Sequence, residues 1–248
     1  MLIADDFGLG RGHDRVILSL LEAGKLDGTS VMVNTAITAQ DISRLRALRR
    51  AGVAQVGLHL NLTHELPGIG ATWRLGSLLL MGLAGRLQRA AINRALSSQA
   101  DIFVNLFGEG PDFIDGHQHC HVFPGVAKLV APLAGNAWLR IPVPSTWAQK
   151  WLNVRAGGNK TVLIMIFALW ARRLFRAQRC QTNKDFSGFL RLDRPHDVAR
   201  WLPRVIAQAG QDCVVMVHPG DATDPLQCTG HAPRSRAIEA QIIAEYRL

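Results

Sequence analysis

Short apolar runs alternate with amphipathic stretches along most of this chain of 248 residues. The apolar runs lack regular polar alternation, which is typical of strands buried on both faces of a parallel sheet. The amphipathic stretches repeat apolar residues at helical spacing, and several end at a glycine. Strands that alternate with helices predict an α/β fold with a parallel sheet. We expect strands over 1–4, 29–34, 55–63, 138–143 and 212–221, a short strand at the start of 112–124, and helices over 13–26, 39–52, 126–135, 197–210 and 234–248.

Polar side chains follow these apolar runs at the point where each run ends. Because the carboxyl ends of parallel strands meet at one edge of a sheet, elements far apart in sequence would bring these side chains to a shared rim. No repeat, low-complexity tract or linker divides the sequence, so the pattern favours one domain. The rim residues expected on this basis are Asp5, Asp6, Asn34, His59, Asn61, Asp115, His117 and His218.

Composition narrows the class of protein. The apolar fraction of 48% is too high for a disordered chain. There are 28 Lys+Arg against 19 Asp+Glu, a formal net charge of +9, and the excess is mostly arginine. A basic balance favours an anionic partner such as a phospholipid surface, nucleic acid or a phosphorylated substrate, without choosing among them. No helix-turn-helix, zinc-finger or RNA-binding signature occurs, so we expect no nucleic-acid partner.

Two longer apolar runs, over 75–96 and 161–179, trail into arginines. The apolar part of the second, 161–171, is about half of the roughly 20 residues that a bilayer span needs, so we expect no transmembrane helix. Two interpretations stay open. The runs form helices packed against the rest of the fold with their arginines in solvent, or they lie on an anionic membrane with Phe167, Trp170 and Phe175 inserted.

The four cysteines, Cys120, Cys180, Cys213 and Cys228, are widely spaced and form no CxxC pair. This spacing predicts reduced thiols. The chain begins without a basic-then-apolar leader, so we expect no secretory signal. The sequence therefore predicts a cytoplasmic protein, located at the inner face of the membrane if its basic runs contact lipid. A homodimer is a further arrangement that we allow for.

The first chemical signal is the pair of adjacent acids Asp5 and Asp6, directly after an apolar run. Adjacent carboxylates repel each other, and a cation beside them would offset that repulsion. One acid could bind a metal while the other takes a proton from metal-bound water. Consecutive residues on a strand point to opposite sides, which favours different roles. The simpler interpretation is that Asp5 caps a turn or the first helix.

The second signal is the segment "DGHQHCH", with His117, His119 and His121 at alternate positions. On an extended strand the three imidazoles would share one face, whereas in a loop they could all differ. Neutral imidazole is a common ligand for divalent metals. A carboxylate with two histidines leaves coordination positions open for water and a substrate oxygen, which suits a hydrolytic metal.

The segments "ADDFGLG", "VGLHLNLT", "DFIDGHQHCHVFP", "LRIP" and "VMVHPGD" occur in an order and spacing that resembles the YdjC-type carbohydrate deacetylases, the family of the chito-oligosaccharide deacetylases and of hopanoid-associated members. The resemblance extends from residue 3 to about 247, with 66–110 and 144–190 poorly matched. It implies an irregular, TIM-barrel-like (β/α) barrel related to the polysaccharide deacetylases, in a single domain over 1–248. For this family the chain is short at both ends, so either the barrel closes incompletely or part of the sequence is missing.

The resemblance also implies a site. Asp6, His59 and His117 would bind one divalent metal ion, magnesium or zinc, since the mixed oxygen and nitrogen set does not decide between them. Asp5 would be the general base and His218 the general acid. The substrate-binding residues expected are Arg140, which would hold Asp5 or the substrate, Asn61, and His121, which would bind the sugar or tune the metal. The tryptophans that we single out for stacking on a sugar ring are Trp147 and Trp151, which follow "RIPVPST" in a proline-rich loop near the expected rim.

The function implied is removal of an N-acetyl group from an amino sugar, either an oligosaccharide or a lipid-linked sugar. Two alternatives stay open. The first is a metal-dependent hydrolase of another bond, such as a phosphoester, which the positive charge would suit. The second is a non-enzymatic basic protein that binds membrane or nucleic acid. Acids on the rim disfavour the second, because they would repel phosphate unless a cation intervened.

Overall fold

A computed structural model describes residues 1–34, 36–70, 72–225 and 232–246. Seven strands form one sheet in the order β5-β4-β3-β2-β1-β7-β6, and every pairing is parallel. Their short apolar sequences are buried, as expected for strands covered on both faces. The strands are β1 (Leu2–Phe7), β2 (Gly28–Val31), β3 (Gln55–Leu60), β4 (Phe113–Gly116), β5 (Trp138–Leu139), β6 (Asp185–Ser187) and β7 (Cys213–Val217).

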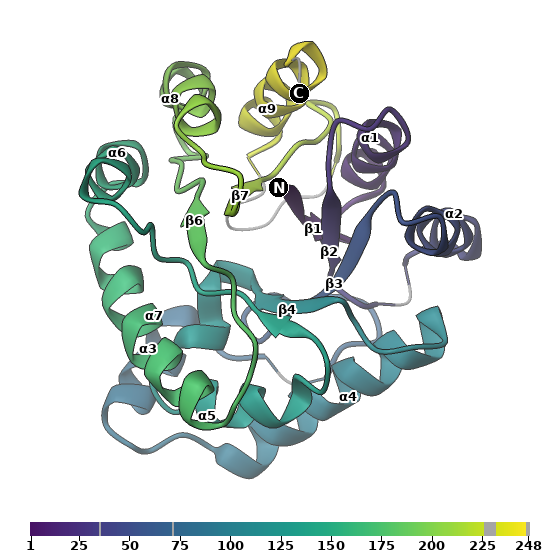
Figure 1. Cartoon of the computed structure of the whole chain (residues 1–248). Helices are drawn as coiled ribbons and strands as arrows, with labels where there is room; N and C mark the ends of the chain where they lie inside the picture. The colour runs from purple at the N-terminus through teal and green to yellow at the C-terminus, as the bar shows by residue number, and fades with distance from the viewer. Residues whose placement is uncertain (35, 71, 226–231, 247–248) are drawn as a thin grey trace.

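Helices surround the curled sheet on its outside (Figure 1). They are α1 (Arg11–Glu22), α2 (Ala39–Arg50), α3 (Leu75–Leu83), α4 (Arg89–Phe107), α5 (Val126–Val130), α6 (Trp147–Gly157), α7 (Lys160–Ala177), α8 (Pro195–Ala207) and α9 (Pro233–Glu245). Two 3₁₀ turns, η1 (His117–Val122) and η2 (Ala131–Leu133), lie on either side of α5. The hydrophobic core fills the sheet interior and the layer between sheet and helices.

The two edges of the sheet meet through a narrow contact. Leu139 of β5 forms a parallel bridge with Thr182, and its N–H donates to the carbonyl of Gln181 at 2.9 Å. The side chain of Asn183 then accepts from the N–H of Ile141 at 2.6 Å and donates to its carbonyl at 3.1 Å. This contact curls the sheet into an irregular (β/α) barrel, so the predicted fold class is confirmed.

Several elements differ from the sequence-based expectation. The predicted strand over 138–143 is a two-residue strand, because the chain beyond Leu139 pairs through the side chain of Asn183. β6, with three residues, was not predicted. Neither was α6, which lies in a segment interpreted as a proline-rich loop. Its start is nevertheless encoded locally, because Thr146 and Gln149 form a capping box.

The two arginine-rich apolar runs are helical. The run over 75–96 spans α3 and the first part of α4, and α7 accounts for most of 161–179. Phe167 and Phe175 are 3% and 0% exposed, so the prediction that they insert into a membrane is wrong: both face the core. Trp170 is exposed. No helix in the described part of the chain is both long enough and apolar enough to cross a bilayer.

Three of the four cysteines can be compared with the prediction. Cys120, Cys180 and Cys213 are free thiols, as expected for cysteines without a nearby partner. Cys228 lies outside the described residues.

Candidate active site

The acids Asp5 and Asp6 lie at the carboxyl end of β1, where the strand stops being regular. The register between β1 and β2 shifts between Ala4 and Phe7, and Asp6 has a φ of 67°. A non-glycine residue in the left-handed region is energetically costly and is often found at functional sites. The simple alternation assumed from the sequence therefore does not describe this end of the strand. Both carboxylates are buried at the rim.

Asp6 forms the centre of a cluster drawn from distant parts of the chain. Its Oδ1 lies 3.1 Å from Nε2 of His59, on β3, and 3.0 Å from Nδ1 of His117, at the start of η1. Its Oδ2 accepts from Nη2 of Arg236, on α9, at 2.5 Å. Burial alone would raise the pKa of Asp6, but Arg236 and His117 outweigh it and hold this pKa well below its usual range.

Two polar groups on the side away from Asp6 orient the ring of His59. Its Nδ1 lies 2.7 Å from Oδ1 of Asp115, at the end of β4, and 3.0 Å from the hydroxyl of Ser30. A carboxylate on one imidazole nitrogen fixes the ring and directs the other nitrogen toward a metal position, here toward Asp6. Burial would lower the pKa of His59, but Asp115 outweighs it and the pKa rises to about 10. Bound metal would replace that proton on Nε2.

Asp5 is held by an arginine rather than by histidines. Nη1 of Arg140 donates to both carboxylate oxygens of Asp5, at 2.7 and 2.6 Å, and lies 2.7 Å from Oδ2 of Asp115. The three side chains are all nearly inaccessible to solvent. Burial raises the pKa of Asp5 to about 6, although Arg140 opposes this rise. The same arginine, with His59, outweighs burial at Asp115 and lowers its pKa to about 2.

The three histidines of "DGHQHCH" diverge, as the loop interpretation allows. Gln118 and His119 have φ values of 52° and 59°, which turns the chain sharply after His117. His119 packs 5.2 Å from the ring of Phe189, whereas Nε2 of His121 lies 2.9 Å from the carbonyl of Arg140. Burial lowers the pKa of His121 to about 4, so its ring is neutral. Of these three histidines, only His117 reaches the Asp6 cluster.

His218 follows β7 on the same rim. Burial lowers its pKa to about 3, although the charge of Asp6 opposes this change. Its backbone N–H donates to Oε2 of Glu239, a buried residue of α9, and its Nδ1 lies 4.0 Å from Oε1 of the same carboxylate. Burial raises the pKa of Glu239 to about 7.

Sequence reasoning missed Arg236 and Glu239. They lie three residues apart on α9, which places both on one face of the helix, and that face is turned toward the rim. In the sequence they look like the ordinary charges of a surface helix, and only their burial reveals a role.

The predicted metal ligands fit a metal. One nitrogen or oxygen from each of Asp6, His59 and His117 lies within 4.8 Å of the other two, and all three residues are buried. Such a facial set of one carboxylate and two imidazoles can hold one divalent ion with open positions. Asp5, His59 and Asp115 make a second group of this kind. Its Asp5 and Asp115 are already paired with Arg140, which favours the first group.

Other predicted rim residues have local contacts. The side chain of Asn61 accepts from the N–H groups of Thr63 and His64 and donates to the carbonyl of His64, so it shapes the turn after β3. Asn34 donates to the carbonyls of Gly8 and Met32 and links the ends of β1 and β2. A contact of Asn61 with substrate stays a prediction.

Trp147 and Trp151 do not lie at the rim. They are 84% and 65% exposed on α6. Gln149, in the first turn of this helix, contacts Asp185 at the start of β6 and the carbonyl of Gln208 at the end of α8. The helix therefore begins at the amino-terminal edge of the sheet, opposite the rim, and the expected place of these tryptophans is wrong.

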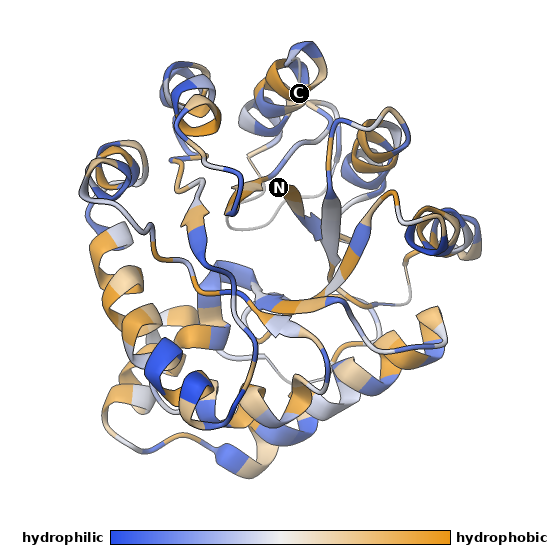
Figure 2. Ribbon diagram, in the orientation of Figure 1, coloured by the Kyte–Doolittle hydropathy of each residue, from blue (hydrophilic) through white to orange (hydrophobic). Residues whose placement is uncertain are grey.

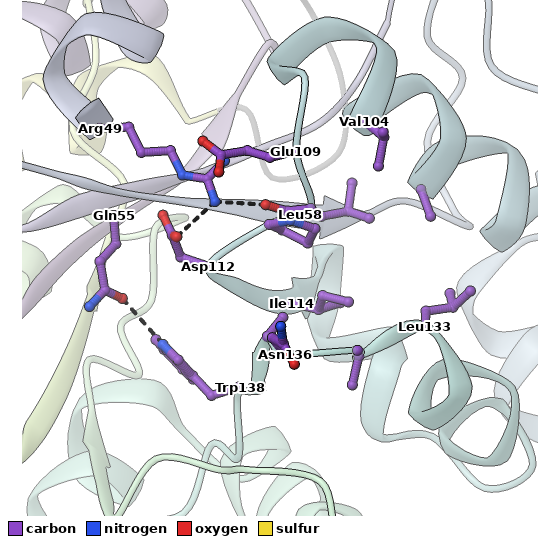
Figure 3. Close-up of a pocket in the computed structure, with 16 residues that line it drawn as sticks. Arg49, Gln55, Leu58, Val104, Glu109, Asp112, Ile114, Leu133, Asn136 and Trp138 are labelled. Atoms are coloured by element: carbon purple, nitrogen blue, oxygen red, sulfur yellow. Dashed lines mark hydrogen bonds and ion pairs between the residues drawn. The ribbon is translucent and has the colours of Figure 1, made fainter.

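The cavity drawn in Figure 3 lies at this opposite edge and contains none of the predicted site residues. Its volume is about 650 Å³. Gln55, Asp112 and Trp138, at the beginnings of β3, β4 and β5, form one side, and helix α4 and the chain near η2 form the other. The indole N–H of Trp138 donates to Gln55, and Arg49 reaches Asp112.

Comparison with known proteins identifies the family. The model of the YdjC-like proteins matches residues 1–248. A chitooligosaccharide deacetylase of Proteus mirabilis is 34% identical over 99% of this chain and 90% of its own length. One from Enterobacter is 35% identical over 54% of each chain, so the chain spans about half the length of that relative. The crystal structure of a candidate cellobiose-phosphate cleavage protein from Enterococcus faecalis superposes with a TM-score of 0.64 at 16% identity, over 98% of this chain and 89% of that one, which supports the fold. Because the family model matches the chain along its whole length, the chain belongs to the YdjC-like protein family.

Proposed function

We propose that this protein is a metal-dependent hydrolase that removes an N-acetyl group from an amino sugar. One observation carries the proposal. Asp6, His59 and His117 come from three separate elements and bring their ligand atoms together around one point. A second carboxylate, Asp5, lies beside them and is not one of the proposed metal ligands. The chitooligosaccharide deacetylases among its relatives support the choice of bond.

Asp6, His59 and His117 would hold the divalent ion, which we propose to be magnesium or zinc. When bound, the ion polarises the acetyl carbonyl and lowers the pKa of water beside it. Asp115, by accepting a hydrogen bond from Nδ1 of His59, would leave Nε2, which faces Asp6, free to bind the ion. Arg236 keeps the carboxylate of Asp6 ionised and fixed.

Asp5 is the proposed general base. A pKa of about 6 leaves the carboxylate mostly ionised at neutral pH and still able to take a proton. Arg140 fixes both oxygens, so the carboxylate does not rotate away from the water. Asp5 takes one proton from water while the water oxygen adds to the acetyl carbon.

His218 is the proposed general acid. It gives a proton to the amide nitrogen as the carbon–nitrogen bond breaks, which releases acetate and a free amino sugar. Because burial holds its pKa at about 3, the imidazole has to take up this proton during the cycle. The carboxylate of Glu239, 4.0 Å from Nδ1, favours that uptake.

The finer assignments belong to the same proposal. Arg140, Asn61 and His121 lie close to the rim and are the proposed positioning and substrate-binding residues. The substrate is an oligosaccharide or a lipid-linked amino sugar, and the proposed location is the cytoplasm or the inner face of the membrane.

Acetate release from N-acetylglucosamine oligomers tests the reaction, with phosphate release from a generic phosphoester as the competing assay. We expect acetate, and no phosphate. Metal analysis of the purified protein and of an Asp6→Ala, His59→Ala double variant tests the site. We expect about one ion per chain in the parent and none in the variant. Equal metal content in the two proteins, or phosphate without acetate, would contradict the proposal.

A further inference from the structure

A face of the molecule outside the proposed site exposes large apolar side chains from two helices. α3 and α7 pack against the same loop, since Gly82 of α3 contacts the carbonyl of Pro124 and the ring of Phe167 in α7 lies 6.1 Å from that of Phe123. The exposed fractions of its apolar residues run from 38% for Leu75 to 68% for Leu80. This surface, called the α3–α7 face, comprises Leu75, Leu80, Leu83, Val162, Leu163, Ile166, Leu169 and Trp170.

The exposure is systematic on α7. Ile166, Leu169 and Trp170 lie at helical spacing on its outer side, while Phe167 and Phe175 face the core. A helix on the surface of a soluble domain normally carries polar residues on its outer side. In Figure 2, α7 is orange over much of its length and becomes blue toward its end, where its arginines begin. An apolar surface of this kind marks a contact with something other than water.

Charge identifies the kind of contact. Residues 66–100 and 141–184 contain 12 of the 28 Lys+Arg and none of the 19 Asp+Glu. The rest of the chain holds 16 basic residues against 19 acidic ones, so these two segments account for the whole positive excess. They carry α3, α6, α7 and the start of α4. Arg86, Arg89, Arg173 and Arg176 are exposed in the two segments that form the face.

We propose that the α3–α7 face docks on an anionic lipid bilayer, with both helices lying in the headgroup region. Apolar side chains bordered by arginines and free of acids suit that partner. A second copy of this chain would place the same cationic segments against each other, and a nucleic acid would leave the leucines uncovered. α7 also packs against η1, which begins at His117, so the docked face borders the rim that carries the proposed site.

Sedimentation with vesicles of phosphatidylcholine, with and without phosphatidylglycerol, tests the docking at low and moderate salt. We expect binding only with phosphatidylglycerol, weakened by salt. A Leu169→Glu, Trp170→Glu variant should bind at least about tenfold more weakly, because two apolar anchors are lost and two negative charges are added. Leu80→Glu on α3, and the pair Arg173→Gln and Arg176→Gln, should each weaken binding as well.

Val53→Glu is the matched control. Val53 is 46% exposed and closely follows the end of α2, and Figure 1 shows α2 across the barrel from α7, so this variant should bind like the parent. Absence of binding to the anionic vesicles at low salt would overturn the proposal. So would binding that the α3 and α7 variants leave unchanged, or a dimer in solution that those variants dissociate. Acetate release from a soluble substrate should be the same in all of these variants, so failure of docking and failure of the proposed chemistry are distinguishable.

Discussion

The two ends of β4 carry the same kind of ion pair in different surroundings. Asp115, at its carboxyl end, faces Arg140, and Asp112, just before its start, faces Arg49 at 2.8 Å. The side chains of Arg140 and Asp115 are each 1% exposed, whereas those of Arg49 and Asp112 are 12% and 30% exposed.

This difference in burial decides what each pair can do. Water screens the pair at the amino-terminal edge, so it contributes little beyond securing the beginnings of the strands. At the carboxyl edge water is excluded, and each charge depends on its neighbours for solvation. Such a site shifts pKa values strongly, as it does for Asp5 and His59. Chemistry is therefore expected only at the carboxyl edge, although the 650 Å³ cavity lies at the other.

The largest expected effect is on catalysis. Asp5→Asn removes the proposed base but keeps the shape of the side chain, so the rate of acetate release should fall about 10³-fold. Metal content should stay at the parent level, because Asp5 is not among the proposed ligands. Asp112→Asn at the other end of the sheet is the control, and its activity should equal that of the parent. Similar losses in both variants would mean that the two edges do not differ as proposed.

The next largest effect is on stability. Arg140→Met leaves two buried carboxylates without their cation, which should lower the free energy of unfolding by about 3–5 kcal/mol. Arg49→Met removes the screened pair and should cost less than about 1 kcal/mol. Urea denaturation of both variants at neutral pH measures the difference. Equal costs at the two edges would show that burial does not separate them.

Local sequence signals predicted the core of the site because each is contained in a few residues. Apolar runs that end in Asp6, His59 and His117 indicate three strand ends, and the rule that parallel strands share a carboxyl edge brings those ends together. The family resemblance then assigned roles that the spacing alone left open.

The parts of the fold and of the site that the sequence did not predict depend on contacts that no local pattern encodes. β6 is recognisable only through its pairing with β7. The barrel closes through one bridge and the side chain of Asn183. Arg236 reaches Asp6 across 230 positions of sequence, and nothing near Arg236 marks it as a site residue. The left-handed conformation of Asp6 is likewise set by its surroundings, because its type alone would favour an ordinary strand end.

A third effect concerns pH. Burial raises the pKa of Asp14 to about 8, against 3.8 for an ordinary aspartate, while its Oδ1 accepts from the N–H of Gly8 just after the site. Between these two values the folded protein keeps a proton that the unfolded chain has lost. The free energy of unfolding therefore falls as pH rises through this window, by on the order of a few kcal/mol.

Asp14→Asn keeps an oxygen acceptor for Gly8 and cannot ionise, so it should remove that part of the pH dependence. The variant and the parent should be similar in stability near pH 4, and the variant should be the more stable near pH 8. Urea denaturation of the variant and the parent across this pH range measures the difference in their free energies of unfolding. An unchanged slope in the variant would mean that Asp14 does not titrate in this window.

The smallest effect separates a functional from a structural carboxylate on α9. Glu239→Gln removes the charge beside His218, so the imidazole should be harder to protonate. The rate of acetate release should fall about tenfold above pH 7, with little change in KM, and the difference from the parent should shrink below pH 7, where Glu239 of the parent is itself protonated. Glu245→Gln, on an exposed residue at the end of the same helix, should change neither the rate nor its pH dependence.

A purely structural role for Glu239 would lower the rate equally at every pH, because it would reduce the folded fraction without altering the acid. The pH dependence of the loss therefore decides whether the charge network of the carboxyl edge extends from β4 through the site to α9.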